Sequence, residues 1–175
     1  MKKFMKVSVM AFVAMFAINT VVNAQEVKMT SYADEDMVFQ YPADWKPTEN
    51  TREDVAFEGK DGVSMVEVSA RYGEFDADGV KEWAAEKKER KAIWSLKGGD
   101  VVTNGNINTI RFTGVKETYD SVKGLVKQNI VCISFAVISN GNTLAGDITY
   151  LQKDEAKMKP VVEKMLASMK AQSED

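Results

Sequence analysis

After the first 24 residues, the longest apolar run spans residues 130–138 and reads Ile-Val-Cys-Ile-Ser-Phe-Ala-Val-Ile. Its β-branched and aromatic residues favour a strand. A strand with one face in water would alternate with polar residues, and this run does not, so we predict a central strand that is covered on both faces. This segment requires a sheet with packed layers on both of its sides.

Further strands are predicted at residues 37–41, 55–59, 63–72, 101–103, 107–115 and 143–152. The turn Lys60-Asp61-Gly62 is short enough to join the second and third of these strands in a hairpin. Residues 139–142 join the central strand to the last one in the same way. Short hairpin connections indicate a mostly antiparallel sheet, because parallel strands need longer crossovers.

Two helices are predicted. The first spans about residues 77–94, with Asp76 as its N-cap and a Glu86–Arg90 ion pair on its exposed face. The second has one continuous apolar stripe with helical spacing, formed by Met158, Val161, Val162, Met165, Leu166 and Met169. Pro160 is expected in the first turn of this helix, where its missing N–H does no harm.

These elements predict an α+β fold, a three-layer α/β/α sandwich with a mostly antiparallel sheet and one helix on each face. Residues 25–175 are 151 residues, an ordinary size for one domain with a core of its own. No internal repeat or linker interrupts them. We therefore predict a single domain over residues 25–175.

Residues 1–24 have the three parts of a secretory signal peptide. Three lysines precede an almost unbroken apolar run at residues 7–18, and Val22-Asn23-Ala24 supplies the small residues of a cleavage site. We predict cleavage after Ala24 and a periplasmic or secreted mature protein. No cysteine lies near the cleavage point, which disfavours a lipid-anchored product.

The mature chain is acidic. The whole chain has 23 basic and 26 acidic side chains, and the three lysines of the signal leave 20 basic ones, so the mature net charge is −6. Binding to nucleic acid or to anionic lipid depends on clustered Lys and Arg, so neither is expected as a partner. No second apolar run approaches the roughly 20 residues that cross a bilayer, so no membrane span is predicted in the mature form.

The usual catalytic residue sets are missing. Histidine is absent, which removes the commonest general base and the commonest transition-metal ligand. Cys132 is the only cysteine, so no intramolecular disulfide forms, and its place in the apolar run predicts a small core residue. No Ser/His/Asp set, Gly-x-Ser-x-Gly elbow or Ser-x-x-Lys motif is present. We predict that the protein is not an enzyme and has no cofactor.

Two acidic clusters were considered as metal sites. Glu74, Asp76 and Asp78 precede Gly79 at the alternate positions of a calcium loop, but the closing acid would fall at Ala85. A helix cap explains these acids more simply, and calcium remains the alternative. The cluster at residues 34–36 is explained as a solvated turn. We assign no metal.

A family resemblance rests on few residues. Phe39-x-Tyr41-Pro42-x-x-Trp45 follows a short N-terminal strand, and Val162-x-x-Met165-Leu166-x-Ser168-Met169 lies in the closing helix. With two helices separated by sheet, this pattern resembles the PsbP-like group, which includes the Mog-type Ran-binding proteins and many small exported bacterial proteins. The resemblance implies an αβα sandwich that binds other proteins or assists their assembly without chemistry of its own. Metal-binding histidines of photosynthetic members have no counterpart here.

The one basic and aromatic concentration is the predicted first helix. Lys87, Arg90, Lys91 and Trp94 are our candidate partner-binding residues, because Trp and Arg are favoured at the centres of interfaces. The alternative is a solvated helix face, with Trp94 anchoring the end of the helix in the core.

We therefore predict an exported, non-catalytic binding or assembly-accessory protein, with an envelope or secreted protein as its partner. A carrier of a small apolar ligand, held between the sheet and the helix at residues 77–94, is the first alternative. An enzyme that uses only carboxylates, Lys or Tyr is the second, since 26 acids contain many pairs and nothing singles one out.

Overall fold

The computed structural model describes residues 26–48, 54–71 and 73–172. The predicted signal peptide and its cleavage site after Ala24 lie outside these ranges. In the described ranges, neither helix is long and apolar enough to cross a membrane.

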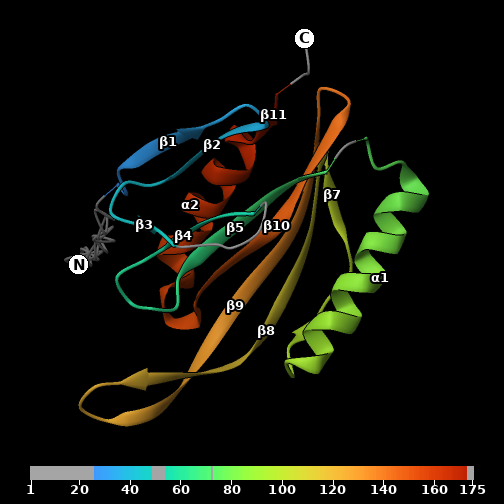
Figure 1. The fold of residues 1–175 in the computed structure, drawn as a ribbon. Helices are drawn as coiled ribbons and strands as arrows, with labels where there is room; N and C mark the ends of the chain where they lie inside the picture. The colour runs from blue at the N-terminus through green and yellow to red at the C-terminus, as the bar shows by residue number, and fades with distance from the viewer. Residues whose placement is uncertain (1–25, 49–53, 72, 173–175) are drawn as a thin grey trace, which may run out of the picture.

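The described part of the chain forms two helices and eleven strands (Figure 1). The helices are α1 (Ala77–Ile93) and α2 (Glu155–Ser168), and a short 3-10 turn, η1 (Gln152–Asp154), precedes α2. The strands are β1 (Met29–Ala33), β2 (Met37–Pro42), β3 (Lys46–Pro47), β4 (Val55–Glu58), β5 (Met65–Arg71), β6 (Lys97–Gly98), β7 (Val102–Asn104), β8 (Ile107–Asp120), β9 (Gly124–Ser139), β10 (Asn142–Leu151) and β11 (Lys170–Ala171).

The larger sheet has the order β3-β4-β5-β10-β9-β8-β6, and β7 also pairs with β8. All of its strand pairs are antiparallel, which confirms the predicted α+β fold with a mostly antiparallel sheet. Every residue from Ile130 to Val137 except Ile133 is buried, as the apolar run predicted. The predicted β4–β5 hairpin is confirmed as well, and Asp61 stabilises its turn by accepting hydrogen bonds from the N–H groups of Val63 and Ser64.

One seam joins the first half of the larger sheet to the second. There β5 pairs with β10, and the Ser69 hydroxyl donates to the Ala145 carbonyl across 76 residues of sequence. Gly146 lies in this seam, and a Cβ atom on it would collide with the carbonyl oxygen of Glu67. The strands therefore approach this closely only because residue 146 has no side chain.

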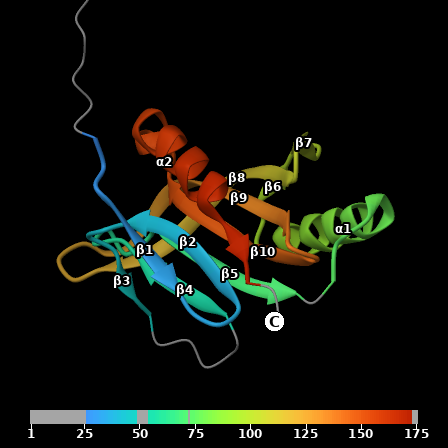
Figure 2. The ribbon, with the colours of Figure 1, turned by 90° about the horizontal axis from the view of Figure 1, so that it is seen from above.

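A second sheet, of order β1-β2-β11, was not predicted. Its middle strand β2 carries Phe39, which is fully buried, and Tyr41, whose ring stacks on Phe57 with centroids 3.8 Å apart. The strands β1 and β11 are short, and Ala171 is their one buried residue, so they lack the apolar pattern that reveals a strand. In Figure 2 this sheet lies beside α2, whereas α1 is set apart beyond β10.

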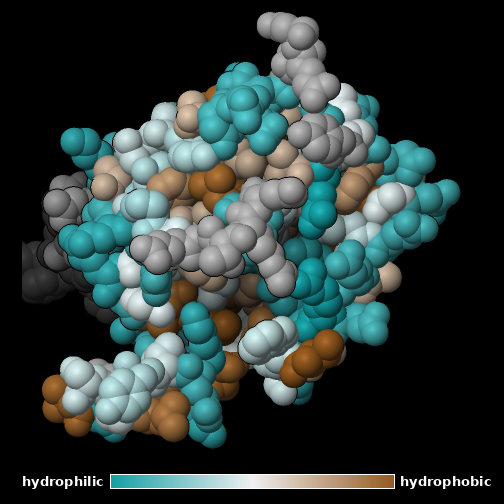
Figure 3. All heavy atoms as spheres, viewed as in Figure 1, coloured by the Kyte–Doolittle hydropathy of each residue, from teal (hydrophilic) through white to brown (hydrophobic). Residues whose placement is uncertain are grey.

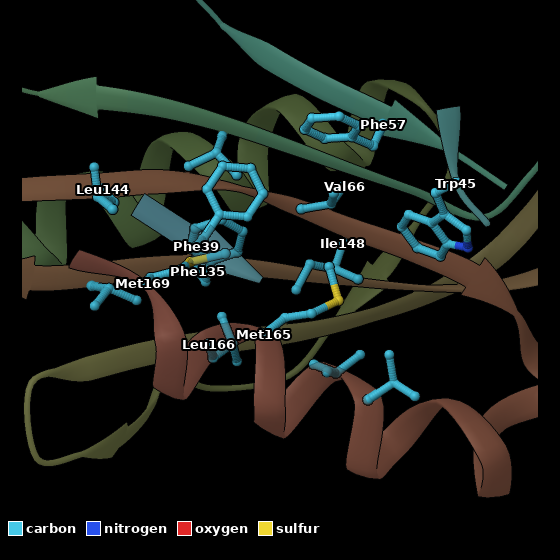
Figure 4. Close-up of a cluster of buried hydrophobic side chains, with 14 of the residues drawn as sticks. Phe39, Trp45, Phe57, Val66, Phe135, Leu144, Ile148, Met165, Leu166 and Met169 are labelled. Atoms are coloured by element: carbon cyan, nitrogen blue, oxygen red, sulfur yellow. The ribbon is translucent and has the colours of Figure 1, made fainter. Parts of the chain in front are cut away.

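The main core lies between α2 and both sheets (Figure 4). The apolar stripe predicted for this helix is buried along its whole length. Met165 reaches from α2 toward Ile148 of β10, and both are fully buried. The hydroxyl of Ser168 accepts a hydrogen bond from the N–H of Gln40 at 2.8 Å and so connects the end of α2 to β2.

The predicted position of Pro160 is wrong. Because η1 leads directly into α2 at Glu155, the helix begins three residues before Met158, the first member of its apolar stripe. Pro160 is therefore the sixth residue of the helix, on its exposed side. Its missing N–H leaves the carbonyl of Ala156 without its usual helical donor.

A smaller core lies under α1. It contains Trp83 and Ala84 of the helix together with Ile110, Phe112, Cys132 and Ala136 of the sheet. Alternate residues of β9 thus belong to different cores, since Val131, Phe135 and Val137 pack in the core of α2. The predicted three-layer sandwich is incomplete as a description, because it omits the second sheet.

Candidate functional site

Helix α1 carries all but one of the predicted partner-binding residues, and local signals explain why it forms. The Asp76 carboxylate accepts hydrogen bonds from the N–H groups of Asp78 and Gly79 at 3.1 and 2.7 Å, which confirms the N-cap. The ion pair between Glu86 and Arg90 is also present, at 3.3 Å. Only Trp83 and Ala84 of this helix are buried, so most of its side chains remain near solvent.

The structure divides the four candidate residues into two groups. Lys87 and Lys91 lie one turn apart and direct their ammonium groups to one oxygen of Asp147, at 3.4 and 2.8 Å. Their side chains are only 15% and 17% exposed. Arg90 and Trp94 instead lie at the surface. The two lysines are therefore engaged inside the protein, and only Arg90 and Trp94 face outward.

Asp147 is the centre of this cluster and was not singled out in the sequence. It lies on β10, and its second carboxylate oxygen accepts a short hydrogen bond from the hydroxyl of Ser134 on β9. The thiol of Cys132 lies 3.9 Å from the same oxygen. An aspartate inside a predicted strand was the signal that could have revealed it, because aspartate is depleted in strands.

The surroundings of Asp147, Lys91 and Cys132 favour the ionised carboxylate, the ammonium group and the neutral thiol. Burial alone would raise the pKa of Asp147, but the charges of Lys87 and Lys91 and the hydrogen bonds from Lys91 and Ser134 hold it below its usual value. Burial alone would lower the pKa of Lys91, but Asp147 holds it above its usual value. Burial raises the pKa of the Cys132 thiol most, and the negative charge of Asp147 raises it further, although the positive charge of Lys91 lowers it.

These pKa directions argue against catalysis by the cluster. A thiol with a raised pKa is a weak nucleophile at neutral pH, and the buried position of Cys132 agrees with the predicted core residue. A carboxylate with a lowered pKa is a poor base for the Ser134 hydroxyl, and a lysine with a raised pKa is not a neutral amine. The arrangement fits a polar clamp that fixes α1 to the sheet.

Glu67 of β5 lies beside this clamp, directly opposite Asp147 in the strand register. Burial raises its pKa most, and the negative charges of Asp54 and Asp147 raise it further, although Lys87 and Lys91 counteract them. The two lysines thus form direct ion pairs with Asp147, whereas their charges only partly offset the effects that raise the pKa of Glu67. Glu67 was also missed in the sequence, where it appeared as one polar residue of an alternating strand.

The acidic residues considered for calcium have other partners. Besides the N-cap Asp76, Glu74 accepts a hydrogen bond from the N–H of Gly141 at 3.2 Å, and Asp78 forms an ion pair with Lys81 at 2.8 Å. In the second acidic cluster, Asp34 accepts hydrogen bonds from the N–H groups of Asp36 and Met37 and shapes the turn before β2. Across the described ranges, no group of three or more metal-ligating side chains is gathered.

The interpretation of Trp94 as a core anchor is wrong. Its side chain is 73% exposed, and Ile93 beside it is exposed to a similar extent. The anchor at this point is Leu96, which packs against the smaller core under α1 and against a third cluster of Val63, Ile130 and Leu151. It also fills the space that Gly114 leaves free. The chain reaches this position because Ser95 adopts a positive φ of 58° and turns it back to the sheet.

A long hairpin supplies the other exposed apolar group. Strands β8 and β9 continue beyond the Gly114–Ile130 pair as a two-stranded ribbon over residues 115–129. Figure 3 shows this ribbon projecting at the lower left, with apolar side chains along it. Its exposed large side chains are Val115, Tyr119, Val122 and Leu125. Tyr119 and Leu125 are direct cross-strand neighbours, 79% and 74% exposed, so they form one patch at the tip.

The ribbon was predicted only in part. The predicted strands ended at residue 115 and began again at residue 130, and residues 116–129 were not assigned to either strand. Each strand continues because the pairs Glu117–Lys127 and Tyr119–Leu125 face each other, the first as an ion pair of 3.3 Å.

The chain matches no model of a known protein family and no curated protein. Its fold, however, is similar to that of several solved structures. The PsbP protein CyanoP of the cyanobacterium Synechocystis matches with a TM-score of 0.54 and 10% identity, over 83% of this chain and 93% of that one. The Ran-binding protein Mog1p of Saccharomyces cerevisiae matches with a TM-score of 0.51 and 12% identity, over 81% and 95%.

A structure from Bacteroides thetaiotaomicron matches with a TM-score of 0.47 and 16% identity, over 79% of this chain. The match covers only 46% of that longer chain. CyanoP and Mog1p both belong to the group that the sequence resembles, so the PsbP/Mog-like fold implied by the resemblance is confirmed.

Proposed function

We propose that the protein is an exported, non-catalytic binding or assembly-accessory protein that contacts an envelope or secreted protein through the tip of its β8–β9 ribbon. The observation that carries this proposal is the patch of Tyr119 and Leu125, with Val122 at the turn 90% exposed. A two-stranded ribbon is marginally stable by itself, and large apolar side chains on it gain free energy only when a partner covers them.

The polar clamp supports the non-catalytic part of the proposal. It contains the only cysteine of the chain and a serine next to a carboxylate, yet the pKa directions of Asp147, Lys91 and Cys132 all oppose nucleophilic or base chemistry. Mog1p, which has a similar fold, is a Ran-binding protein, so this fold serves protein recognition in at least one case. Export is supported by the sequence of residues 1–24.

The exposed patch makes the proposal testable. The double variant Tyr119→Ser/Leu125→Ser should fold normally and lose a protein that the wild-type chain captures from an envelope extract. Val102→Ser is the matched control, because Val102 is 64% exposed but lies on β7, away from the ribbon tip. Capture that is equal in the double variant and in the control would exclude the ribbon tip as the binding surface.

Export is tested separately. Fractionation of cells that express the full chain should place the protein in the periplasm or the medium, and mass spectrometry should show Gln25 as its first residue. An intact residue 1 in a cytoplasmic fraction would contradict the predicted signal peptide.

A small-ligand carrier is the second candidate, at a different place from the one predicted. Trp83 and Phe112 fill the space between α1 and the sheet, where the pocket was expected. A hollow of about 340 Å³ lies instead between β1 and α2, lined by apolar side chains that include Val27, Met29 and Val161. A fluorescent fatty acid that shifts the NMR signals of these residues would favour this candidate, and unchanged signals would remove it.

A further inference from the structure

Strand β1 is an open sheet edge that lacks the usual protection against pairing. In the described ranges it pairs with β2 alone, and Figure 1 shows it as the outer strand of the smaller sheet. Edge strands of natural proteins often carry charged residues or proline, which discourage another chain from pairing with them. The edge strand β3 of the larger sheet does so, because it consists of Lys46 and Pro47. The five residues of β1, Met29-Thr30-Ser31-Tyr32-Ala33, include neither a charge nor a proline.

The backbone groups on this edge follow from the register of the β1–β2 pair. At the two ends of the pair, the Lys28 carbonyl accepts a hydrogen bond from the N–H of Ala43, and the Asp34 N–H donates to the carbonyl of Met37. The register between these ends is unbroken. The even-numbered residues of β1 therefore bond to β2, because an antiparallel strand alternates the side to which its backbone groups point. The N–H and C=O groups of residues 29, 31 and 33 point to the open edge.

A second copy of β1 fits this edge in one two-fold register. If Ser31 faces Ser31 of the second copy, Met29 faces Ala33, and every residue of β1 pairs with a residue of β1. The outward groups of residues 29, 31 and 33 then meet one another and form about six hydrogen bonds, two for each pair of residues. A two-fold contact of this kind is self-complementary, because each copy offers the same surface to the other.

Opposite charges flank this neutral strand. In the same register Lys28 faces Asp34 of the second copy, and the symmetry repeats this pair at the other end. Lys28 is exposed, and within the described ranges neither side chain has an oppositely charged partner. The carboxylate of Asp34 accepts hydrogen bonds only from uncharged donors, the hydroxyl of Tyr32 and the N–H groups of Asp36 and Met37, so its charge is not neutralised.

The acids beyond the strand do not oppose this pairing. After Asp34 the chain turns back into β2, so Glu35 and Asp36 leave the line of β1. Glu26 precedes the strand and already forms an ion pair with Lys164 at 2.9 Å. The remaining charges at the ends of the two paired strands therefore attract one another.

We propose that β1 pairs with β1 of a second copy of this chain, so that the smaller sheets of the two copies form one continuous antiparallel sheet. A single pairing of five residues buries less area than a standard protein interface, so the dimer is weak, with a Kd on the order of 10–100 μM. This inference is independent of the proposed function, because in Figure 1 β1 lies at the top of the molecule and the ribbon at the bottom.

Sedimentation equilibrium of residues 25–175, which contain every described element, tests the dimer between about 5 and 500 μM, a range that spans the expected Kd. Ser31→Pro removes an N–H group from the open edge and none from the β1–β2 pair, so it should raise the Kd more than about tenfold. Ser31→Ala keeps this N–H group and is the matched control, with the Kd of the wild type. A wild-type chain that stays monomeric throughout, or a Ser31→Pro variant that dimerises normally, would overturn the proposal.

Amide hydrogen exchange of the wild-type chain tests the register without any substitution. Raising the concentration from about 5 to about 500 μM should slow exchange at residues 29, 31 and 33 at least about threefold, because their amides become hydrogen-bonded only in the dimer. The amides of residues 30 and 32 already bond to β2, so their exchange should not change. Unchanged exchange at residues 29, 31 and 33 would contradict pairing through β1.

Charge reversal tests the flanking ion pairs. Lys28→Glu places like charges at both ends of the paired strands, so it should raise the Kd of the dimer about three- to tenfold, and more at low salt. Lys46→Glu, on the exposed strand β3, is the matched control and should not change the Kd. Equal dimerisation of the two variants would overturn pairing in this register.

Discussion

Helices α1 and α2 both pack against the larger sheet, but different contacts hold them. Helix α2 buries five apolar side chains, whereas α1 buries Trp83 and Ala84 and is fixed by the contacts of Lys87 and Lys91 with Asp147. Burial of apolar area is non-directional and insensitive to pH, whereas an ion cluster depends on geometry and on protonation. The two helices should therefore respond differently to mutation and to acid.

The largest effect is expected for Met165→Ala in α2. Met165 is fully buried in the main core, so its truncation should lower the free energy of unfolding by about 3 kcal/mol. Urea unfolding followed by circular dichroism measures the loss. Glu163→Ala, on the exposed side of the same helix, should change stability by less than about 0.5 kcal/mol. A loss below about 1 kcal/mol for Met165→Ala would mean that the core of α2 is loosely packed.

Asp147→Asn should have the next largest effect. It removes the carboxylate that Lys87 and Lys91 both contact and leaves Glu67 as the nearby negative charge. We expect a loss of about 2 kcal/mol at pH 7, less than for a fully buried pair, because the two ammonium groups keep some solvent contact. Asp100→Asn, which affects only the exposed pair with Lys88, should leave stability unchanged. A neutral effect of Asp147→Asn would show that the clamp does not hold α1.

The pH dependence of this loss has a definite sign. The pKa of Asp147 is lowered in the folded state, so its stabilising contribution is present above the ordinary aspartate pKa of about 3.9 and is lost as pH falls through the lower folded value. The difference between wild type and Asp147→Asn should therefore persist at pH 5–7 and shrink below about pH 4. A difference that grows in acid would contradict this assignment.

Leu96→Ala and Trp94→Ala test which residue anchors the end of α1. Leu96 is partly buried against two clusters, so its truncation should cost about 1.5 kcal/mol. Trp94 is largely exposed, so Trp94→Ala should change stability by less than about 0.5 kcal/mol. Thermal unfolding of both variants measures the contrast, and the reverse order would restore Trp94 as the core anchor.

The smallest effect is expected for Glu67→Gln, and it has the opposite sign. Burial and the charges of Asp54 and Asp147 raise the pKa of Glu67, so its contribution to stability is present below its ordinary pKa and lost as pH rises through the raised value. Removing the charge should stabilise the protein at pH 7 by a few tenths of a kcal/mol, about 0.5 at most after solvent screening. The gain should vanish near pH 4, and destabilisation at pH 7 would refute it.

Sequence reasoning was most successful where side chains are buried in a regular pattern. The apolar stripe of α2 and the run in β9 predicted both elements and their buried residues. The cap at Asp76 predicted where α1 begins, but a cap carries no information about which face of the helix is buried. For that reason Lys87 and Lys91 were grouped with Arg90, although they face the sheet.

The residues that were missed depend on contacts between distant segments. Asp147 acquires its role from two lysines on α1, which lie 56 and 60 residues away in sequence. The strands β1 and β11 pair with β2 from opposite ends of the described chain and have little apolar pattern of their own. The ribbon tip was missed because a paired but exposed hairpin has no buried face to give it periodicity.

The seam between β5 and β10 affects how the protein reaches its folded state. Hairpins such as β4–β5 and β9–β10 join strands that are close in sequence, whereas the seam must bring Ser69 to Ala145 across 76 residues. Closing such a long loop is slow, so the two halves of the sheet should form before they meet. Until then the unpaired edges of β5 and β10 can pair with wrong strands. Because Gly146 has no side chain, the two strands can then pair without a clash against the backbone of Glu67. A larger residue there should therefore increase aggregation during refolding.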